Sequence, residues 1–331
     1  MKILVINLMP AIGELLFVTP AFKVIRQAFP EATIDVLIAE DVRQLCLYNR
    51  NLDKIISFDK KRGQAGIIAH FKLIREIRKY RYDLVINLNP SERASLIAAL
   101  SRGKKICGFA TKSFKLFFNP YLVKDRSIHS ADCYLKALRE IGIPNIGDNK
   151  LEMEYDRQSQ AIADRIWLEN NFQNQTIVGV HPGANWPSKR WKPEYLAKLS
   201  DMLQQDGIKM VFFGGPSDIE IVEKVASLTK IQPVILTGKL NLLELAAVIK
   251  KCSVFLSGDS GPMHIAVSQQ VPVVALFGPT RPARYGPYHS PHIVIEPDNN
   301  ILANEDKKKL MEYITPGQVY QGIYSLLKNQ I

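Results

Sequence analysis

The chain has 331 residues, of which 47% are hydrophobic and 23% charged, so it is a globular protein long enough for two domains of ordinary size. No apolar run approaches the roughly 18 residues that a membrane-spanning helix needs, and the four scattered cysteines offer no close pair for a zinc site or a disulfide framework. These features exclude an integral membrane protein and a disulfide-rich secreted scaffold, and they indicate a reducing, cytoplasmic compartment.

The first half of the sequence is predicted to alternate strands and helices. Strands are expected at residues 3–7, 33–38, 54–58 and 83–88, and helices at 14–29, 41–48 and 67–79. Pro20 lies inside the first helical stretch and should kink it or mark a late start. Such alternation is typical of a parallel sheet with helices on both faces.

The second half repeats this scheme. Strands are expected at 176–181, 209–214, 234–236, 254–257 and 273–277, and helices at 193–206, 218–228, 242–251 and 263–269. A helix at 157–170 separates the halves, and the C-terminal helix within residues 316–331 could pack back on the first domain or on the second. We therefore expect an α/β protein with two doubly wound domains, residues 1–155 and 172–315.

The net charge of +11 is unevenly distributed. Residues 1–155 contain 25 Lys and Arg against 16 Asp and Glu, whereas the remainder contains 18 against 16. Such a surface favours an anionic partner, although the basic run at 72–81 is explained more simply as a solvated helix face. Because no nucleic-acid-binding motif and no interleaved aromatic residues accompany the charge, we expect no nucleic-acid partner.

Residues 254–266 carry the clearest functional signal. An apolar run at 254–256 predicts a buried strand, and Ser-Gly-Asp-Ser-Gly-Pro at 257–262 leads into an apolar helix. The first N–H groups of such a helix have no internal partners and favour an anion, most often a phosphate. Ser260 would add a hydroxyl, Gly261 would let backbone approach the ligand, and His264 would face the same mouth one turn later.

Loops after two other predicted strands carry candidate charges. Lys189 and Arg190 lie between two tryptophans, where either cation could neutralise a diphosphate or stack on indole. Asp218 follows a glycine pair and could hold a ribose hydroxyl or only start its helix. The sequence contains neither the G-x-G-x-x-G nor the P-loop motif, which argues against a dinucleotide oxidoreductase and a P-loop NTPase.

Glu14 stands at the start of the first predicted helix. The helix dipole stabilises a carboxylate there by about 0.3–1 kcal/mol, which is a sufficient structural reason for it. The functional alternative is a general base that takes a proton from a hydroxyl. Because the histidines show no metal-ligand spacing and no Asp-x-Asp accompanies Asp259, we expect catalysis without a metal or another cofactor.

Together these residues resemble the heptosyltransferases of glycosyltransferase family 9. The similarity covers nearly the whole chain, through residues 11–20, 181–191, 213–215, 236–245 and the most specific block, Gly-Asp-Ser-Gly-Pro-Met-His and its continuation at 258–280. The resemblance implies the GT-B architecture, in which two Rossmann-like domains face each other across a cleft. It also implies inverting, metal-independent transfer of heptose from ADP-heptose to the lipopolysaccharide inner core. The first domain would bind the acceptor and the second the nucleotide sugar.

The resemblance also assigns roles to single residues. Glu14 and Lys189 would be catalytic. The implied donor-binding residues are Asn185, Asp218, Leu240, Asp259, Ser260, Gly261 and His264. The expected acceptor-binding residues are Gly13, Lys60, Lys61 and Arg62.

The sequence departs from the family pattern at the base. Glu14 occupies a position that usually holds aspartate, so its carboxylate lies about 1 Å further out, and a misplacement of that size can cost about 100-fold in rate. Asn7-Leu8-Met9 replaces the basic residue usual after the first strand. Two alternatives stay open: a relative that uses another nucleotide sugar or acceptor, and a non-catalytic binding protein of lipopolysaccharide assembly.

The charge of the first domain fits the implied acceptor. An inner-core glycan carries carboxylates and phosphates and lies at a membrane surface, and a positive domain would be drawn to both. We therefore expect a cytoplasmic protein that is peripherally associated with the inner membrane.

Overall fold

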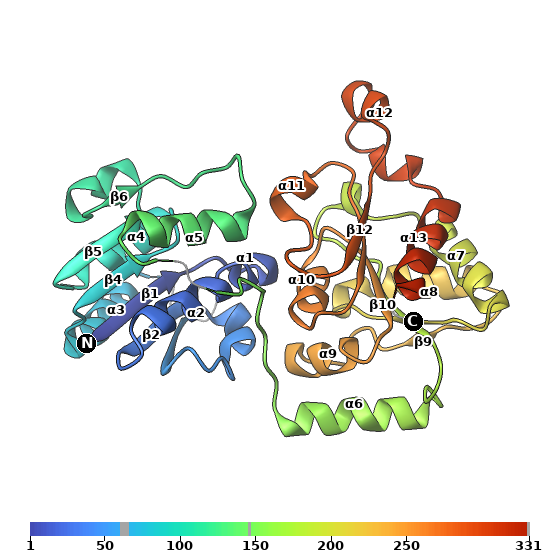
Figure 1. Ribbon diagram of the computed structural model, residues 1–331, viewed down its shortest axis with the longest axis horizontal. Coiled ribbons are helices and arrows are strands. Elements are labelled where there is room, and N and C mark those ends of the chain that lie inside the picture. The colour runs from blue at the N-terminus through green and yellow to red at the C-terminus, as the bar shows by residue number, and fades with distance from the viewer. Residues whose placement is uncertain (60–65, 145–146, 330–331) are drawn as a thin grey trace. The chain divides into compact units, whose positions relative to one another are not determined.

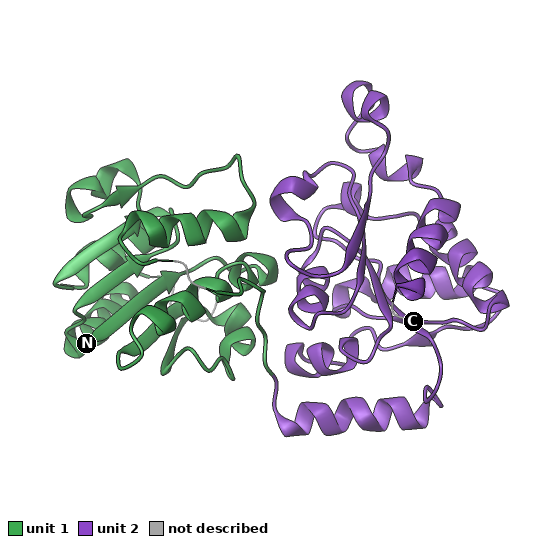
Figure 2. Ribbon diagram, viewed as in Figure 1, with its two compact units in different colours: residues 1–154 green, residues 155–331 purple. Residues whose placement is uncertain are grey.

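The fold is that of a computed structural model, which describes residues 1–59, 66–144 and 147–329. The chain forms two compact units, Met1–Glu154 and Tyr155–Ile331 (Figure 2). Each unit has its own six-stranded sheet, and every pair of neighbouring strands described in either sheet is parallel.

The sheet of unit 1 has the strand order β3-β2-β1-β4-β5-β6 (Figure 1). Its strands are β1 (Lys2–Asn7), β2 (Thr33–Ala39), β3 (Lys54–Phe58), β4 (Leu84–Asn87), β5 (Lys105–Phe109) and β6 (Tyr121–Leu122). The central strands β1 and β4 are buried almost throughout. Strands covered on both faces need near-continuous apolar runs, which is the pattern that made them predictable.

Helices cover both faces of this sheet. The 14-residue helix α3 (Ile67–Tyr80), α4 (Glu92–Leu100) and the 3-10 helix η2 (Lys112–Phe117) share a core with the sheet face that carries Leu4 and Ile6. Among the other helices of the unit, α2 (Thr19–Ala28) packs against α5 (Ser130–Glu140). Helix α1 (Ile12–Leu16) contacts the 3-10 helix η1 (Glu40–Cys46).

The start of unit 1 differs from the sequence prediction in two places. The helix expected over 14–29 is two helices, α1 and α2, and Pro20 lies in the first turn of α2. A proline is tolerated there because the first-turn N–H groups have no partner within the helix. Pro20 therefore marks a late start and not a kink. The helix expected at 41–48 is the 3-10 helix η1.

Unit 2 repeats the topology of unit 1. Its strands are β7 (Ile177–His181), β8 (Lys209–Phe212), β9 (Val234–Ile235), β10 (Val254–Gly258), β11 (Val273–Leu276) and β12 (His292–Ile295). Their order, β12-β11-β10-β7-β8-β9, is that of unit 1 counted from the opposite edge.

The sheet of unit 2 is also covered by helices. They are α6 (Arg157–Glu169), α7 (Pro193–Gln205), α8 (Ile219–Leu228), α9 (Leu242–Ile249), α10 (Gly261–Ser268), α11 (Pro282–Tyr285), α12 (Asn299–Asn304) and α13 (Pro316–Lys328), with 3-10 turns η3 (Pro187–Lys189), η4 (Pro216–Asp218) and η5 (Leu310–Tyr313). Of the two positions left open for the C-terminal helix, the structure shows the one on unit 2, where α13 packs on α7 and β12. The linking helix α6 packs on α9.

Each sheet reverses its strand order at one point, between β1 and β4 in unit 1 and between β7 and β10 in unit 2. The loops that leave the carboxyl ends of two such strands run to opposite faces of the sheet, so a ligand can bind between them. Glu14 follows β1, Lys189 follows β7, and Ser260 follows β10. The main predicted residues therefore lie at the reversal points.

Candidate functional site

In unit 2 the helix α10 begins directly after β10. Ser260 is the residue before the helix, with extended backbone angles, and Gly261 and Pro262 form its first positions. The backbone of the loop after β7 lies close to the end of β10, because a Cβ added at Gly258 would come within 3.1 Å of the Lys189 carbonyl oxygen. The loops after β7 and β10 therefore meet at the N-terminal tip of α10.

A histidine joins three of these strand-end segments. His181, the last residue of β7, lies with Nδ1 2.9 Å from Ser260 Oγ and with Nε2 3.3 Å from Asp218 Oδ2. Ser260 Oγ is also 2.8 Å from the Ser257 hydroxyl, and Asp218 Oδ2 accepts the Gly215 N–H at 2.9 Å. Because His181, Asp218 and Ser257 are buried, the network fixes the three loops relative to one another.

The Asp218 carboxylate is held in its charged form. Burial by itself would raise its pKa, but the hydrogen bond and charge of His181, the Gly215 N–H and the charge of Arg190 together lower the pKa below its ordinary value. A carboxylate with this environment is a hydrogen-bond acceptor throughout the neutral range.

Two glycines leave room for that carboxylate. A Cβ at Gly183 would lie 1.9 Å from Asp218 Oδ1, and a Cβ at Gly214 would lie 2.7 Å from Oδ2. Gly214 also has a φ of +154°, a conformation that side chains rarely adopt. Glycine is therefore required at 183 and 214 by the space that the Asp218 carboxylate occupies.

Lys189 is the cation at the tip of α10. Its Nζ is 2.7 Å from Asp259 Oδ2 and 4.9 Å from the centre of the Trp186 ring, so a carboxylate and an aromatic face together orient it. Arg190 is turned differently and donates from Nε to the Ala184 carbonyl oxygen at 3.0 Å. The structure thus distinguishes the two cations that the sequence left equivalent.

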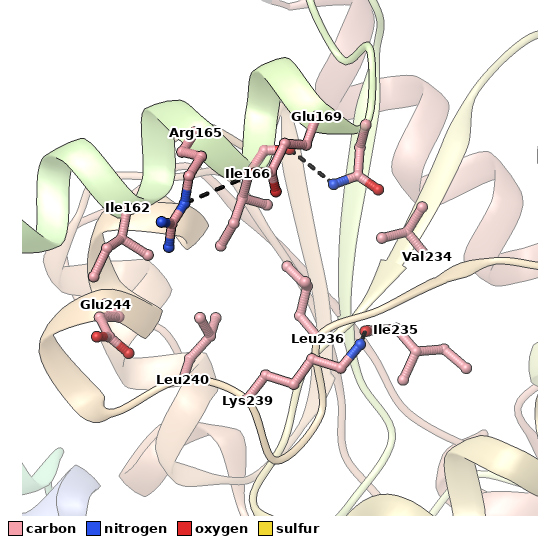
Figure 3. A pocket seen from close by; sticks show the side chains of 11 residues that line it. Ile162, Arg165, Ile166, Glu169, Val234, Ile235, Leu236, Lys239, Leu240 and Glu244 are labelled. Carbon is pink, nitrogen blue, oxygen red and sulfur yellow. Dashed lines mark hydrogen bonds and ion pairs between the residues drawn. The ribbon is translucent and has the colours of Figure 1, made fainter.

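The remaining donor candidates lie around this centre. Asn185 is exposed in the loop after β7, and His264 is buried one turn into α10. Leu240 lines a pocket of about 540 Å³ between α6 and the segment that follows β9 (Figure 3). That segment touches the loop of Asp218, since the Gly238 N–H donates to the Gly214 carbonyl oxygen at 2.9 Å.

In unit 1, Glu14 is held by two donors. Its Oε2 accepts from Tyr134 Oη at 2.8 Å and from Lys124 Nζ at 3.1 Å. Lys124 in turn lies 2.8 Å from Tyr134 Oη and 4.5 Å from the centre of that ring. Burial and the neighbouring Glu14 charge raise the pKa of Tyr134 well above its ordinary value, so the phenol stays a donor.

A second pocket of about 550 Å³ lies at the carboxyl ends of the strands of unit 1. It is lined by Leu8, Met9, Pro10, Ala39, Glu40, Asp41, Phe58, Asp59, Asn89, Ser91 and Arg93. The buried Asn89 amide nitrogen has no hydrogen-bond partner among the described residues, and the Arg93 guanidinium lies 5.6 Å from the centre of the Phe58 ring. The lining thus offers carboxylates, an amide donor and one guanidinium, a set that suits a hydroxyl-rich ligand.

The predicted acceptor residues are only partly covered. Lys60, Lys61 and Arg62 lie outside the described residues. Gly13 lies in α1, where its carbonyl oxygen accepts the Phe17 N–H at 3.0 Å. Within the described ranges, no three His, Cys, Asp or Glu residues are grouped so that they could hold a metal ion, and no helix is both long and apolar enough to cross a membrane.

The family model described as Glycosyltransferase family 9 (heptosyltransferase) matches residues 70–314 of the chain. The chain belongs to glycosyltransferase family 9. A solved family 9 glycosyl transferase from Veillonella parvula is 33% identical, with a TM-score of 0.94 over 99% of this chain and 97% of that one.

Two further relatives extend this assignment. The lipopolysaccharide core heptosyltransferase OpsX of Haemophilus influenzae is 27% identical over 295 residues, which cover 87% of this chain and 82% of the relative. The solved ADP-heptose lps heptosyltransferase II of E. coli is 22% identical, with a TM-score of 0.82 over 100% of this chain and 99% of that one, and it shows the shared fold. This family 9 enzyme therefore has the GT-B type of fold predicted from its sequence, with two Rossmann-like α/β units.

Sequence reasoning missed three residues of this glycosyltransferase. One lies at the tip of α10 in unit 2, and two lie around Glu14 in unit 1. His181 was noted only as part of a matching segment, although it ties Ser260 to Asp218. Lys124 and Tyr134 carried no signal at all, because they are 110 and 120 residues from Glu14 in sequence and belong to no recognisable motif. Only the fold brings them to the end of β1.

Proposed function

We propose that this chain transfers a heptose from ADP-heptose to the inner core of lipopolysaccharide, with inversion at the anomeric carbon and without a metal ion. The observation that carries the proposal is the oriented Lys189 ammonium beside the N-terminal tip of α10, at the strand-order reversal of a family 9 enzyme. Three relatives named as lipopolysaccharide or lipooligosaccharide heptosyltransferases match more than four fifths of the chain.

The donor would bind to unit 2. The free N–H groups at the start of α10, with the Ser260 hydroxyl and Lys189, supply the positive potential that a diphosphate needs. Asp218 would accept a ribose hydroxyl, and Asn185 and Leu240 would line the base site. Asp259 is itself an anion, so we assign it the orientation of Lys189 rather than a contact with phosphate.

Glu14 on unit 1 would be the general base. It takes the proton of the acceptor hydroxyl as that oxygen forms its bond to the anomeric carbon. The bond between that carbon and the diphosphate breaks on the opposite side, and ADP leaves with the electron pair. Lys189 and the α10 tip stabilise the charge that develops on the leaving phosphate.

The contacts of Glu14 support this role despite the change from aspartate. Tyr134 and Lys124 both bind Oε2, which leaves Oε1 to accept a proton. The two donors also remove most of the freedom of the longer side chain, so its carboxylate is fixed in one place. This ordering argues against the alternative of a binding protein that has lost its base.

The acceptor would use the pocket at the strand ends of unit 1. Its carboxylates, the Asn89 amide and Arg93 match sugar hydroxyls with a neighbouring acidic group. Gly13, which directly precedes Glu14, would then contact the acceptor as well. We further propose that the enzyme works at the cytoplasmic face of the inner membrane, where the positive unit 1 meets an anionic, lipid-linked acceptor.

Titration calorimetry on the purified chain tests the donor assignment. We expect ADP-heptose to bind at least about tenfold more tightly than UDP-glucose or GDP-mannose, and Lys189→Met to weaken ADP binding by about 10–100-fold through loss of a charge-assisted hydrogen bond. Lys192→Met is the matched control, since Lys192 pairs with the exposed Glu312 at 2.8 Å. Equal affinity for the three nucleotide sugars would instead support a relative with a different donor.

A further inference from the structure

Ser260 stands at the N-cap position of α10 but does not cap that helix. Its backbone is extended, as at an ordinary N-cap, yet its hydroxyl accepts no N–H from the first turn of α10, all of which the structure describes. A serine at this position usually binds the N–H of the second or third helical residue. The Ser260 side chain therefore does not compete with an anion for the N–H groups of the helix tip.

The Ser260 hydroxyl is held by two other side chains. Its Oγ lies 2.9 Å from His181 Nδ1 and 2.8 Å from Ser257 Oγ. The second ring nitrogen, His181 Nε2, lies 3.3 Å from Asp218 Oδ2. The His181 and Asp218 side chains are only 6% and 11% exposed, so the hydrogens of this chain of contacts must be shared among these atoms.

The hydrogens can be placed on the chain in two ways. An ionised Asp218 only accepts, so His181 Nε2 carries a hydrogen in both arrangements. In a neutral ring Nδ1 is then an acceptor, and the Ser260 hydroxyl has to donate to it. In a protonated ring Nδ1 is a donor to Ser260 Oγ, which releases the hydroxyl hydrogen. The charge of His181 therefore decides whether Ser260 offers a ligand a hydrogen or only lone pairs.

We propose that His181 takes up a proton from solvent when the diphosphate of the donor binds at the α10 tip, so that Ser260 donates its hydrogen to a phosphate oxygen. The imidazolium also adds a positive charge behind the tip, where a bound anion favours it. His181 is thus a positioning residue, which acts on the diphosphate through Ser260. This coupling rests on the proposed function for the presence of a diphosphate, but not for the identity of the base or the sugar.

Other charged groups lie around the imidazole. Asp218 of η4 keeps its charge at neutral pH, because its pKa is lowered. The loop after β7 contributes Lys189 and Arg190, and the charge of Arg190 acts on Asp218. The start of α10 contributes Asp259, which pairs with Lys189 at 2.7 Å, and the buried His264. Of these, His264 is the other side chain of the type that changes charge near neutral pH, so the variants below separate the two histidines.

Titration calorimetry in buffers of different ionisation enthalpy counts the protons taken up on binding. The probes are ADP-heptose and UDP-glucose, whose diphosphates are esterified at both ends and so lack the terminal phosphate proton that titrates at about pH 6. We expect a net uptake of up to about one proton per chain at pH 7.5. Because the protonated form binds better, the Kd should rise with pH, by up to about tenfold per unit between pH 7 and 8.5.

Two variants identify the group that takes up the proton. His181→Asn keeps an amide near the place of Nδ1 but cannot titrate, and Ser260→Ala removes the hydroxyl that couples the ring to the ligand. Both should lose most of the proton uptake and of the pH dependence, and Ser260→Ala should weaken binding at pH 7 by about tenfold or more. His292→Asn is the matched control, because His292 is exposed at the start of β12, away from the strand ends, and it should keep the native uptake.

Two results would overturn the coupling. They are equal binding enthalpies of the native chain in all buffers, and native proton uptake in Ser260→Ala, which would assign the proton to another group such as His264. Ser260→Ala is a small truncation, so it decides the matter even if circular dichroism shows that His181→Asn is not folded.

The two probes separate this inference from the proposed function. Binding of UDP-glucose but not ADP-heptose, with proton uptake, would contradict the proposed function and leave the role of His181 standing. Binding of ADP-heptose without proton uptake would do the reverse. Binding of neither probe would overturn both, since no diphosphate would then occupy the tip.

Discussion

Glu14 is held in one place by two donors from elsewhere in unit 1. Its Oε2 is bound by the Tyr134 phenol and the Lys124 ammonium, both from the C-terminal part of unit 1. An aspartate here would draw the carboxylate back by about 1 Å, a change that can matter 100-fold in rate. Glu14, Lys124 and Tyr134 therefore form one group in which the length of the side chain and its donors are matched.

Steady-state kinetics of variants test this group. We expect Glu14→Gln to lower kcat by about 10²–10⁴-fold, because the general base is lost. Lys124→Met should lower kcat by about 10–100-fold, because the carboxylate is no longer fixed. The KM for the donor should stay unchanged in both, since these residues lie in unit 1.

The matched control for Lys124 is Lys136→Met. Lys136 pairs with Asp125 at 2.9 Å and contacts neither Glu14 nor Tyr134 by any described interaction. It should therefore keep the native kcat. Native kcat in Glu14→Gln would remove Glu14 from the mechanism, and a rise in donor KM alone would show that Lys124 acts elsewhere.

The strand-end loops of unit 2 act as one element. His181 at the end of β7 binds Ser260 before α10 and Asp218 in η4, so the segments around β7, β8 and β10 share one buried network. The pKa of Asp218 is lowered in the folded state from an ordinary value of 3.8. Its ionised form therefore contributes stability that is fully present above about pH 5 and is lost as the pH falls through the lower, folded-state pKa.

Urea unfolding from pH 3 to pH 7 tests this contribution. All three tryptophans, Trp167, Trp186 and Trp191, lie in unit 2, so tryptophan fluorescence reports the unfolding of that unit. We expect Asp218→Asn to be less stable than the native chain above pH 5, with the difference shrinking below pH 4. The exposed Asp306→Asn should show no such trend, and a pH-independent difference for Asp218→Asn would contradict the account.

The central strands of both sheets were predicted closely, but several elements were not predicted at all, among them α4, β5, α5 and β12. The apolar runs that became β1, β4, β7 and β10 were correctly placed, because strands buried on both faces leave a strong pattern. The single helix predicted over 14–29 was wrong, because the period of its apolar residues continues across the break at residues 17 and 18. The short edge strand β6 has two residues and leaves almost no pattern.

The two candidate centres differed in how far they could be predicted. The tip of α10 was visible because glycine, serine and proline at fixed offsets are required by the turn and by the start of the helix. The ion pair of Lys189 with Asp259 joins residues 70 apart, and Lys124 lies 110 residues from Glu14. Such pairs depend on strand order, which local sequence patterns do not specify.

The whole molecule combines two units of the same topology with different charge. Both sheets reverse strand order at one point, but unit 1 has a surplus of cations and unit 2 is nearly balanced. This difference fits a division of labour in which unit 2 recognises one small nucleotide sugar through fixed contacts, and unit 1 receives a large anionic acceptor. The proposed reaction requires both units in one chain.

Mass spectrometry of the transfer product tests the central claim most directly. The purified chain is incubated with ADP-heptose and an inner-core oligosaccharide that lacks heptose at the acceptor position, with Glu14→Gln as the parallel control. The account predicts that the oligosaccharide gains the mass of one heptose, and that the gain nearly disappears in the control. An unmodified oligosaccharide with the native chain, or equal modification by Glu14→Gln, would contradict it.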